Sequence, residues 1–178
     1  MAVRLYLDTE FTDFPWTTYN FDHQEVSLDF SHHHLMSMAF YGGSDDTTFY
    51  GELTDFPLEV MSGFVKMNVR PLMDRSAFLE YDTSGLRSAV GKFLYQFEDQ
   101  GVELLFDSHY DWDFFNKLMI DPIPFVVGRN IEGRIDRKKF RQFFKDNRKL
   151  KNHHALHDTM AQHHSYDPNY VSSASDAG

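Results

Sequence analysis

Cysteine is absent from the 178-residue chain. Its absence excludes a disulfide framework, thiolate chemistry and a cysteine-based zinc site. Long apolar runs are missing as well, since no stretch of about 18 apolar residues is available for a membrane span and the N-terminus has no signal-peptide pattern. We therefore expect a cytoplasmic protein without a membrane partner.

Positive charge is scarce and unevenly distributed. The chain has 17 Lys and Arg against 27 Asp and Glu, a net charge of −10 with the 10 histidines neutral. Nine of the basic residues fall within 134–151 against two acidic ones, so this segment is +7 and the remainder is −17. The net charge argues against tight non-specific binding to duplex nucleic acid. The basic segment is either a solvated helical face or a surface that contacts phosphate groups.

The length suits one domain with a sizeable core, expected over residues 1–170, followed by a disordered tail at 171–178. Apolar and aromatic stretches predict strands over 3–8, 35–41, 47–50, 102–106 and 122–127. Helical spacing of apolar residues predicts helices over 83–100, 112–119, 135–149 and 153–164. Residues 11–31 are expected to form a loop, and 57–73 fit no single element. A strand hairpin followed by alternating strands and helices indicates an α/β fold with a mixed sheet.

Two carboxylates lie at the end of the first expected strand. Asp8 and Glu10 are two residues apart, so they point to the same side of the strand, about 6–7 Å from each other. Such a pair is unfavourable in a fold unless solvent or cations neutralise it. An exposed strand end and a cation site both explain the pair.

Three more carboxylates, Asp107, Asp111 and Asp113, follow the strand expected at 102–106. Aspartates in this position often only cap the helix that follows. A cation site here needs no more than one of the three.

The last expected helix opens with the run H-H-A-L-H-D at 153–158. A solvated histidine-rich face or a generic metal-binding surface explains such a run. His154 and Asp158 are four residues apart and share one helical face.

In chain order, these three segments resemble the motifs of the DEDD 3′–5′ exonuclease superfamily, the DnaQ-like branch of the ribonuclease H-like fold. L-Y-L-D-T-E-F resembles the first motif, Y-D-W-D-F the second and H-H-A-L-H-D the third, in its histidine subtype. The short D-T-E-F form is similar to small bacterial and phage exoribonuclease-like proteins. The resemblance spans residues 3–164 and implies a ribonuclease H-like mixed sheet of five to six strands flanked by helices.

The resemblance implies an enzyme that releases nucleoside 5′-monophosphates from the 3′ end of RNA or DNA, with RNA favoured. It also implies two Mg²⁺ or Mn²⁺ ions held by carboxylates, and a histidine that deprotonates the attacking water. By that resemblance the metal ligands are Asp8, Glu10, Asp111 and Asp158, and the general base is His153.

The second motif lacks the usual His-Asn before its aspartate, which leaves Asp107 and Asp113 as alternatives to Asp111. The crowded histidines likewise leave His154 as an alternative to His153. Candidate substrate contacts are Phe11, Thr12, Trp16 and His109. Aromatic side chains after the first motif either stack on a terminal base or only pin the loop to the core.

Two other functions use the same residues. One is a non-catalytic nucleic-acid-binding or metal-binding module, and the other is a nucleotidase-type phosphoesterase. A full set of four acids and a histidine favours catalysis, because a pure binder has no chemical need for all five. The sequence leaves the choice between RNA and DNA open, together with the oligomeric state, for which a homodimer is one option.

Overall fold

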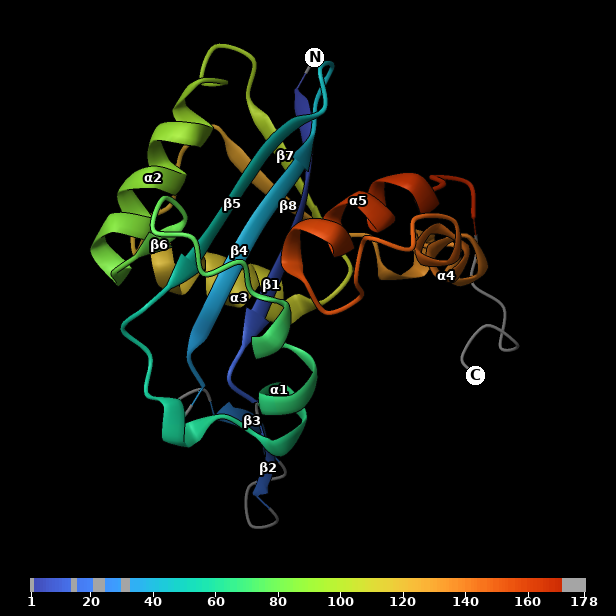
Figure 1. Ribbon diagram of the computed structural model, residues 1–178. Helices are drawn as coiled ribbons and strands as arrows, with labels where there is room; N and C mark the ends of the chain where they lie inside the picture. The colour runs from blue at the N-terminus through green and yellow to red at the C-terminus, as the bar shows by residue number, and fades with distance from the viewer. Residues whose placement is uncertain (1, 14–15, 21–24, 30–32, 171–178) are drawn as a thin grey trace.

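The structure is a computed structural model that describes residues 2–13, 16–20, 25–29 and 33–170. The tail expected at 171–178 lies outside the described residues. A mixed sheet of six strands, in the order β6-β5-β4-β1-β7-β8, forms the centre (Figure 1). Its strands are β1 (Val3–Phe11), β4 (Leu35–Gly42), β5 (Thr47–Leu53), β6 (Glu80–Tyr81), β7 (Val102–Phe106) and β8 (Val126–Asn130).

Strand β1 lies between neighbours of opposite direction. It pairs antiparallel with β4 and parallel with β7, while β4 and β5 form the expected antiparallel hairpin. The outer strands β6 and β8 each run parallel to the strand beside them. The structure therefore confirms the α/β fold with a ribonuclease H-like mixed sheet.

Five helices in the described part of the chain surround the sheet. They are α1 (Gly63–Asn68), α2 (Thr83–Tyr95), α3 (His109–Met119), α4 (Arg137–Asp146) and α5 (Ala155–Ser165). Single 3₁₀ turns occur at Leu58–Val60, Arg70–Leu72 and Glu132–Arg134. Helices α2 and α3 lie on one side of the sheet and α4 and α5 on the other, with α1 near the end of β1 (Figure 1).

The alternation of side chains along β1 explains this arrangement, because successive residues of a strand point to opposite faces. Leu5 and Leu7 are fully buried in the main core, together with Leu94 of α2 and residues of α3. Tyr6 points to the other face, where it packs in a second cluster beside α4. Asp8 and Glu10 share the face of Tyr6, so the face that α5 covers receives the carboxylates.

The loop expected over 11–31 is wrong for two segments. β2 (Trp16–Asn20) and β3 (Glu25–Asp29) pair antiparallel as a separate two-stranded sheet. The sequence W-T-T-Y-N of β2 is rich in β-branched and aromatic residues, which favour strands.

Several element boundaries also differ from expectation. The strand expected at 122–127 is found at β8, beyond the two prolines, which lack the N–H that a ladder needs. β8 is an edge strand, as expected. Helix α3 begins three residues before the expected 112. Helix α4 begins at Arg137 because the Asp136 side chain caps it, accepting from the N–H groups of Lys138 and Lys139, and it ends at Asp146 instead of 149.

Candidate active site

Strand β1 delivers the first two carboxylates. Asp8 is paired with Ala39 of β4 and Glu10 with Ser37, and the register shifts directly after Glu10. The shift interrupts the regular ladder before Phe11, which pairs with Leu35. The carboxylates therefore lie at the last regular pairs of a central strand.

Glu10 lies beside the residues that open α5. Ligand atoms of Glu10, His153 and Asp158 all lie within 4.8 Å of one another, and we call these three residues the histidine group. The backbone N–H of His153 donates to Asp158 Oδ2 at 2.9 Å. His153 has a φ of +67°, a left-handed conformation that a non-glycine residue adopts only where its surroundings hold it. The bond to Asp158 supplies that restraint and fixes the imidazole beside the carboxylates.

Asp8 lies in a second cluster. Its ligand atoms and those of Asp107 and Asp111 lie within 4.8 Å of one another, and we call these three residues the aspartate group. Asp111, in the first turn of α3, accepts two hydrogen bonds at Oδ1, from the Thr9 backbone N–H at 3.0 Å and the Thr9 hydroxyl at 2.7 Å. These bonds fasten α3 to β1.

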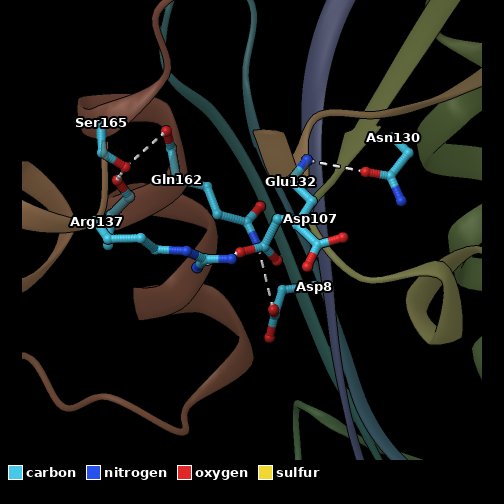
Figure 2. Close-up of polar contacts among 8 residues, drawn as sticks. Asp8, Asp107, Asn130, Glu132, Arg137, Gln162 and Ser165 are labelled. Atoms are coloured by element: carbon cyan, nitrogen blue, oxygen red, sulfur yellow. Dashed lines mark hydrogen bonds and ion pairs between the residues drawn. The ribbon is translucent and has the colours of Figure 1, made fainter. Parts of the chain in front are cut away.

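The two oxygens of Asp107 are both engaged by side chains. Oδ1 accepts from Gln162 Nε2 at 2.9 Å, and Oδ2 accepts from Arg137 Nη1 at 2.8 Å. Gln162 Nε2 also donates to Asp8 Oδ1 at 3.3 Å. Figure 2 shows Arg137, Asp107 and Gln162 converging beside Asp8.

Burial and mutual repulsion shape the charges of the site. Burial raises the pKa of Asp8, Glu10 and Asp111 well above the usual carboxyl range, and the neighbouring carboxylates raise it further. Burial also raises the pKa of Asp158 to about 8. The pKa of His153 is lowered by burial, so its imidazole is neutral at neutral pH. A cation at the site would relieve the repulsion among the ionised carboxylates.

Among the fully buried carboxylate oxygens of the described ranges, two lack a hydrogen-bond partner. They are Asp111 Oδ2 and Asp158 Oδ1, both buried, and each belongs to a different group. Leaving a buried polar atom unsatisfied is unfavourable by about 1–3 kcal/mol, and more for charged groups. Hard divalent cations prefer such carboxylate oxygens. The residues present therefore fit one divalent cation at each group.

The structure separates the alternatives that the sequence left open. Asp111 and Asp107 both join the aspartate group, but Asp111 alone of the two keeps a buried oxygen without a partner in the described structure. Asp113, on the same helix, belongs to neither group. His154 points elsewhere, since its ring stacks on Tyr50 at 4.7 Å and on His157 at 4.0 Å.

The expected substrate contacts have mainly structural surroundings. Phe11 stacks on Phe114 with ring centroids 5.0 Å apart, and Thr12 is fully buried with its hydroxyl accepting from the His34 N–H. The ring of His109, at the start of α3, lies 4.0 Å from that of Tyr110. Trp16 lies in β2, and its side chain is outside the described part.

Sequence reasoning missed several residues of the site. Gln162 is four residues after Asp158 and thus one helical turn away, a spacing that could have revealed it. Phe64 of α1 is 45% exposed, and its ring meets that of His153 edge-on at 5.2 Å. Phe64 and His153 line a small cavity that also includes Glu10. No signal in the sequence singled out Phe64, because 57–73 fitted no single element.

Comparison with known proteins gives no assignment: no family model matches the chain, and no curated protein matches it. None of the helices in the described residues is both long enough and apolar enough to cross a membrane. A functional assignment must therefore come from the site itself.

Proposed function

We propose that the protein is a metal-dependent 3′–5′ exonuclease that acts on RNA in preference to DNA and uses two Mg²⁺ or Mn²⁺ ions. One observation carries the proposal. Segments far apart in the sequence bring two adjoining groups of ligating side chains together, and each group has a buried carboxylate oxygen that lacks a partner in the described structure. The order of these segments along the chain resembles that of the three exonuclease motifs, which supports the proposal.

The chain's own residues have distinct parts in such a reaction. Asp8, Glu10, Asp111 and Asp158 would hold the ions. When bound, two divalent ions neutralise charge at phosphorus and activate the attacking water. His153, neutral at neutral pH and placed beside Glu10 and Asp158, accepts the proton of that water at an imidazole nitrogen. No covalent bond between enzyme and substrate is needed.

Two features near the site suit a single strand. The half-exposed ring of Phe64 beside His153 offers an aromatic surface for an unpaired base. Helix α4 lies in the basic segment 134–151 and packs against α5, which carries Asp158. Positive charge thus lies next to an otherwise acidic site.

The test is digestion of 5′-labelled RNA and DNA oligonucleotides in Mg²⁺ or Mn²⁺. We expect a descending ladder from the 3′ end, formed faster on RNA. Asp111→Asn should lower the rate by more than about a hundredfold, because even residues that only support metal ligands contribute 10- to 100-fold. Asp113→Asn, two residues along the same helix, is the matched control and should leave the rate within a few-fold of the wild type.

Other outcomes of the same assay would overturn the proposal. Hydrolysis of mononucleotides without digestion of oligonucleotides would indicate a nucleotidase-type phosphoesterase. Binding without hydrolysis in either metal would indicate a non-catalytic module. Equal rates for Asp111→Asn and the wild type would remove the aspartate group from the mechanism.

A further inference from the structure

Arg137 connects the basic segment to the acidic site. It is the first residue of α4, and it is the one Lys or Arg of the described residues with an ion pair to either acidic group. Its side chain is 34% exposed, whereas that of its partner Asp107 is 13% exposed. The guanidinium therefore reaches from solvent into the site.

Most of the hydrogen-bonding capacity of this guanidinium remains available. A guanidinium carries five N–H donors, and the contact with Asp107 Oδ2 uses Nη1. The carbon of the guanidinium lies 5.9 Å from the centroid of the Phe140 ring, over its face. The guanidinium thus lies within cation–π range of an aromatic ring, and its remaining N–H groups can bind a further acceptor. A planar fork of donors suits phosphate in particular.

Gln162 and Asp107 hold that fork near Asp8. Gln162 is 1% exposed, and its Nε2 donates to Asp107 Oδ1 and to Asp8 Oδ1. Because both partners are carboxylates, which accept when ionised, the amide nitrogen must be the atom that faces them. Arg137 is therefore connected to Asp8 through the Asp107 carboxylate and the Gln162 amide (Figure 2).

The backbone at the start of α4 offers little to an anion. The Asp136 side chain already accepts from the N–H groups of Lys138 and Lys139, so the usual anion-binding amides of a helix start are occupied. An anion arriving between α4 and the aspartate group must be bound by side chains, and Arg137 is the cation placed there.

We propose that Arg137 binds a phosphate of the substrate strand beside Asp8, and that Asp107 and Gln162 hold its guanidinium in position. The proposal rests on the proposed function and adds a residue that the three motifs do not contain. Arg137 then has two partners at once, Asp107 on the protein side and a phosphate on the solvent side.

The test measures binding rather than turnover. A labelled single-stranded RNA is titrated with the protein by fluorescence anisotropy, in EDTA and in Ca²⁺, at several salt concentrations. Arg137→Gln should weaken binding by about 10- to 100-fold, as for other hydrogen bonds to charged groups. It should also reduce the slope of log K against log salt by about 0.7, the contribution of one phosphate contact on a single strand.

The matched control is Arg129→Gln on β8. Arg129 Nη2 forms an ion pair of similar length with Glu103, at 2.7 Å, away from both acidic groups. The change in net charge is the same, so a loss of affinity confined to Arg137→Gln reports the position of that residue. Equal losses in the two variants would contradict the proposal.

A double variant, Asp107→Asn with Arg137→Gln, separates phosphate binding from simple neutralisation of Asp107. It leaves no unpaired charge and keeps the net charge of the site, so it should fold even where Arg137→Gln does not. If Arg137 only neutralises Asp107, RNA affinity and salt slope return to wild-type values in the double variant, and the proposal is wrong. If Arg137 binds phosphate, both stay low. No RNA binding by the wild type in either buffer would contradict the exonuclease function itself.

Discussion

The histidine group and the aspartate group reach the same formal charge by different means. Glu10 and Asp158 give the histidine group −2, with a neutral imidazole as its third member. The aspartate group has three carboxylates, but the ion pair with Arg137 brings it to −2 as well. Each value matches one divalent cation. The two groups are therefore equivalent in formal charge but differ in chemistry, since only the histidine group contains a base.

The largest effect should come from removing that base. His153→Ala is expected to lower kcat by about 10²- to 10⁴-fold, the usual contribution of a general base. His154→Phe, the neighbouring control, keeps the stacking on Tyr50 and should retain kcat within a few-fold. Steady-state rates on a short RNA in Mn²⁺ measure both. A near-normal kcat in His153→Ala would mean that His153 is not the general base and that the histidine group lacks this distinction from the aspartate group.

Because the two groups have the same formal charge, we expect each to bind one divalent ion with similar affinity. Calorimetric titration with Mn²⁺ should give two bound ions for the wild type, and one for Glu10→Gln, which damages only the histidine group. Binding at one site stabilises the fold by about 2.7 kcal/mol at a hundredfold excess over Kd. The rise in Tm with Mn²⁺ should therefore be smaller in Glu10→Gln than in Asp113→Asn. A single bound ion in the wild type would contradict the equivalence of the two groups in charge.

The smallest expected effect is the pH dependence of the metal-free fold. The folded pKa of Asp158 is about 8, above the ordinary value of about 4, so the folded state keeps a proton that the unfolded state releases. Its contribution to stability is full at low pH and is lost as pH rises through 8. In EDTA, Tm should fall between about pH 6.5 and 8.5, and fall less steeply in Asp158→Asn.

The lower limit of that range is set by the histidines. Burial lowers the pKa of His157 to about 4, so below its ordinary value of about 6.5 the unfolded state takes up a proton first and stability falls with falling pH. Asp121→Asn, which changes an exposed aspartate, is the control and should follow the wild-type curve. Parallel curves for the wild type and Asp158→Asn would place the titrating carboxyls elsewhere.

The central strands could be predicted because their sequences carry their own signals. β1, β4 and β7 are runs of apolar side chains bounded by polar or glycine residues, and each was found close to its expected position. The β2–β3 pair was missed because long polar stretches around it resemble a loop. No element could be predicted for residues 57–73, because this segment holds only short 3₁₀ turns and the six-residue helix α1.

The candidate site was likewise predictable in part from the sequence. The three motifs named the residues that the fold brings together, because each follows or opens an expected element. The resemblance selected Asp111, but the sequence left Asp107 open as an alternative, since both follow β7. The contacts that distinguish the two come from distant segments: Thr9 of β1 occupies one oxygen of Asp111, whereas Arg137 of α4 and Gln162 of α5 occupy both oxygens of Asp107. Such contacts between distant segments leave no local pattern.

The order of these elements along the chain has a consequence for biosynthesis. A ribosome that has completed the chain only through β8 has produced Asp8, Glu10, Asp107 and Asp111, but none of the residues from α4 and α5 that accompany them. Until then the carboxylates lack both Arg137 and His153. A chain terminated or cleaved before 134 would thus hold an acidic sheet edge without a base or a counter-ion. Under the proposed function, such a fragment would be inactive towards RNA.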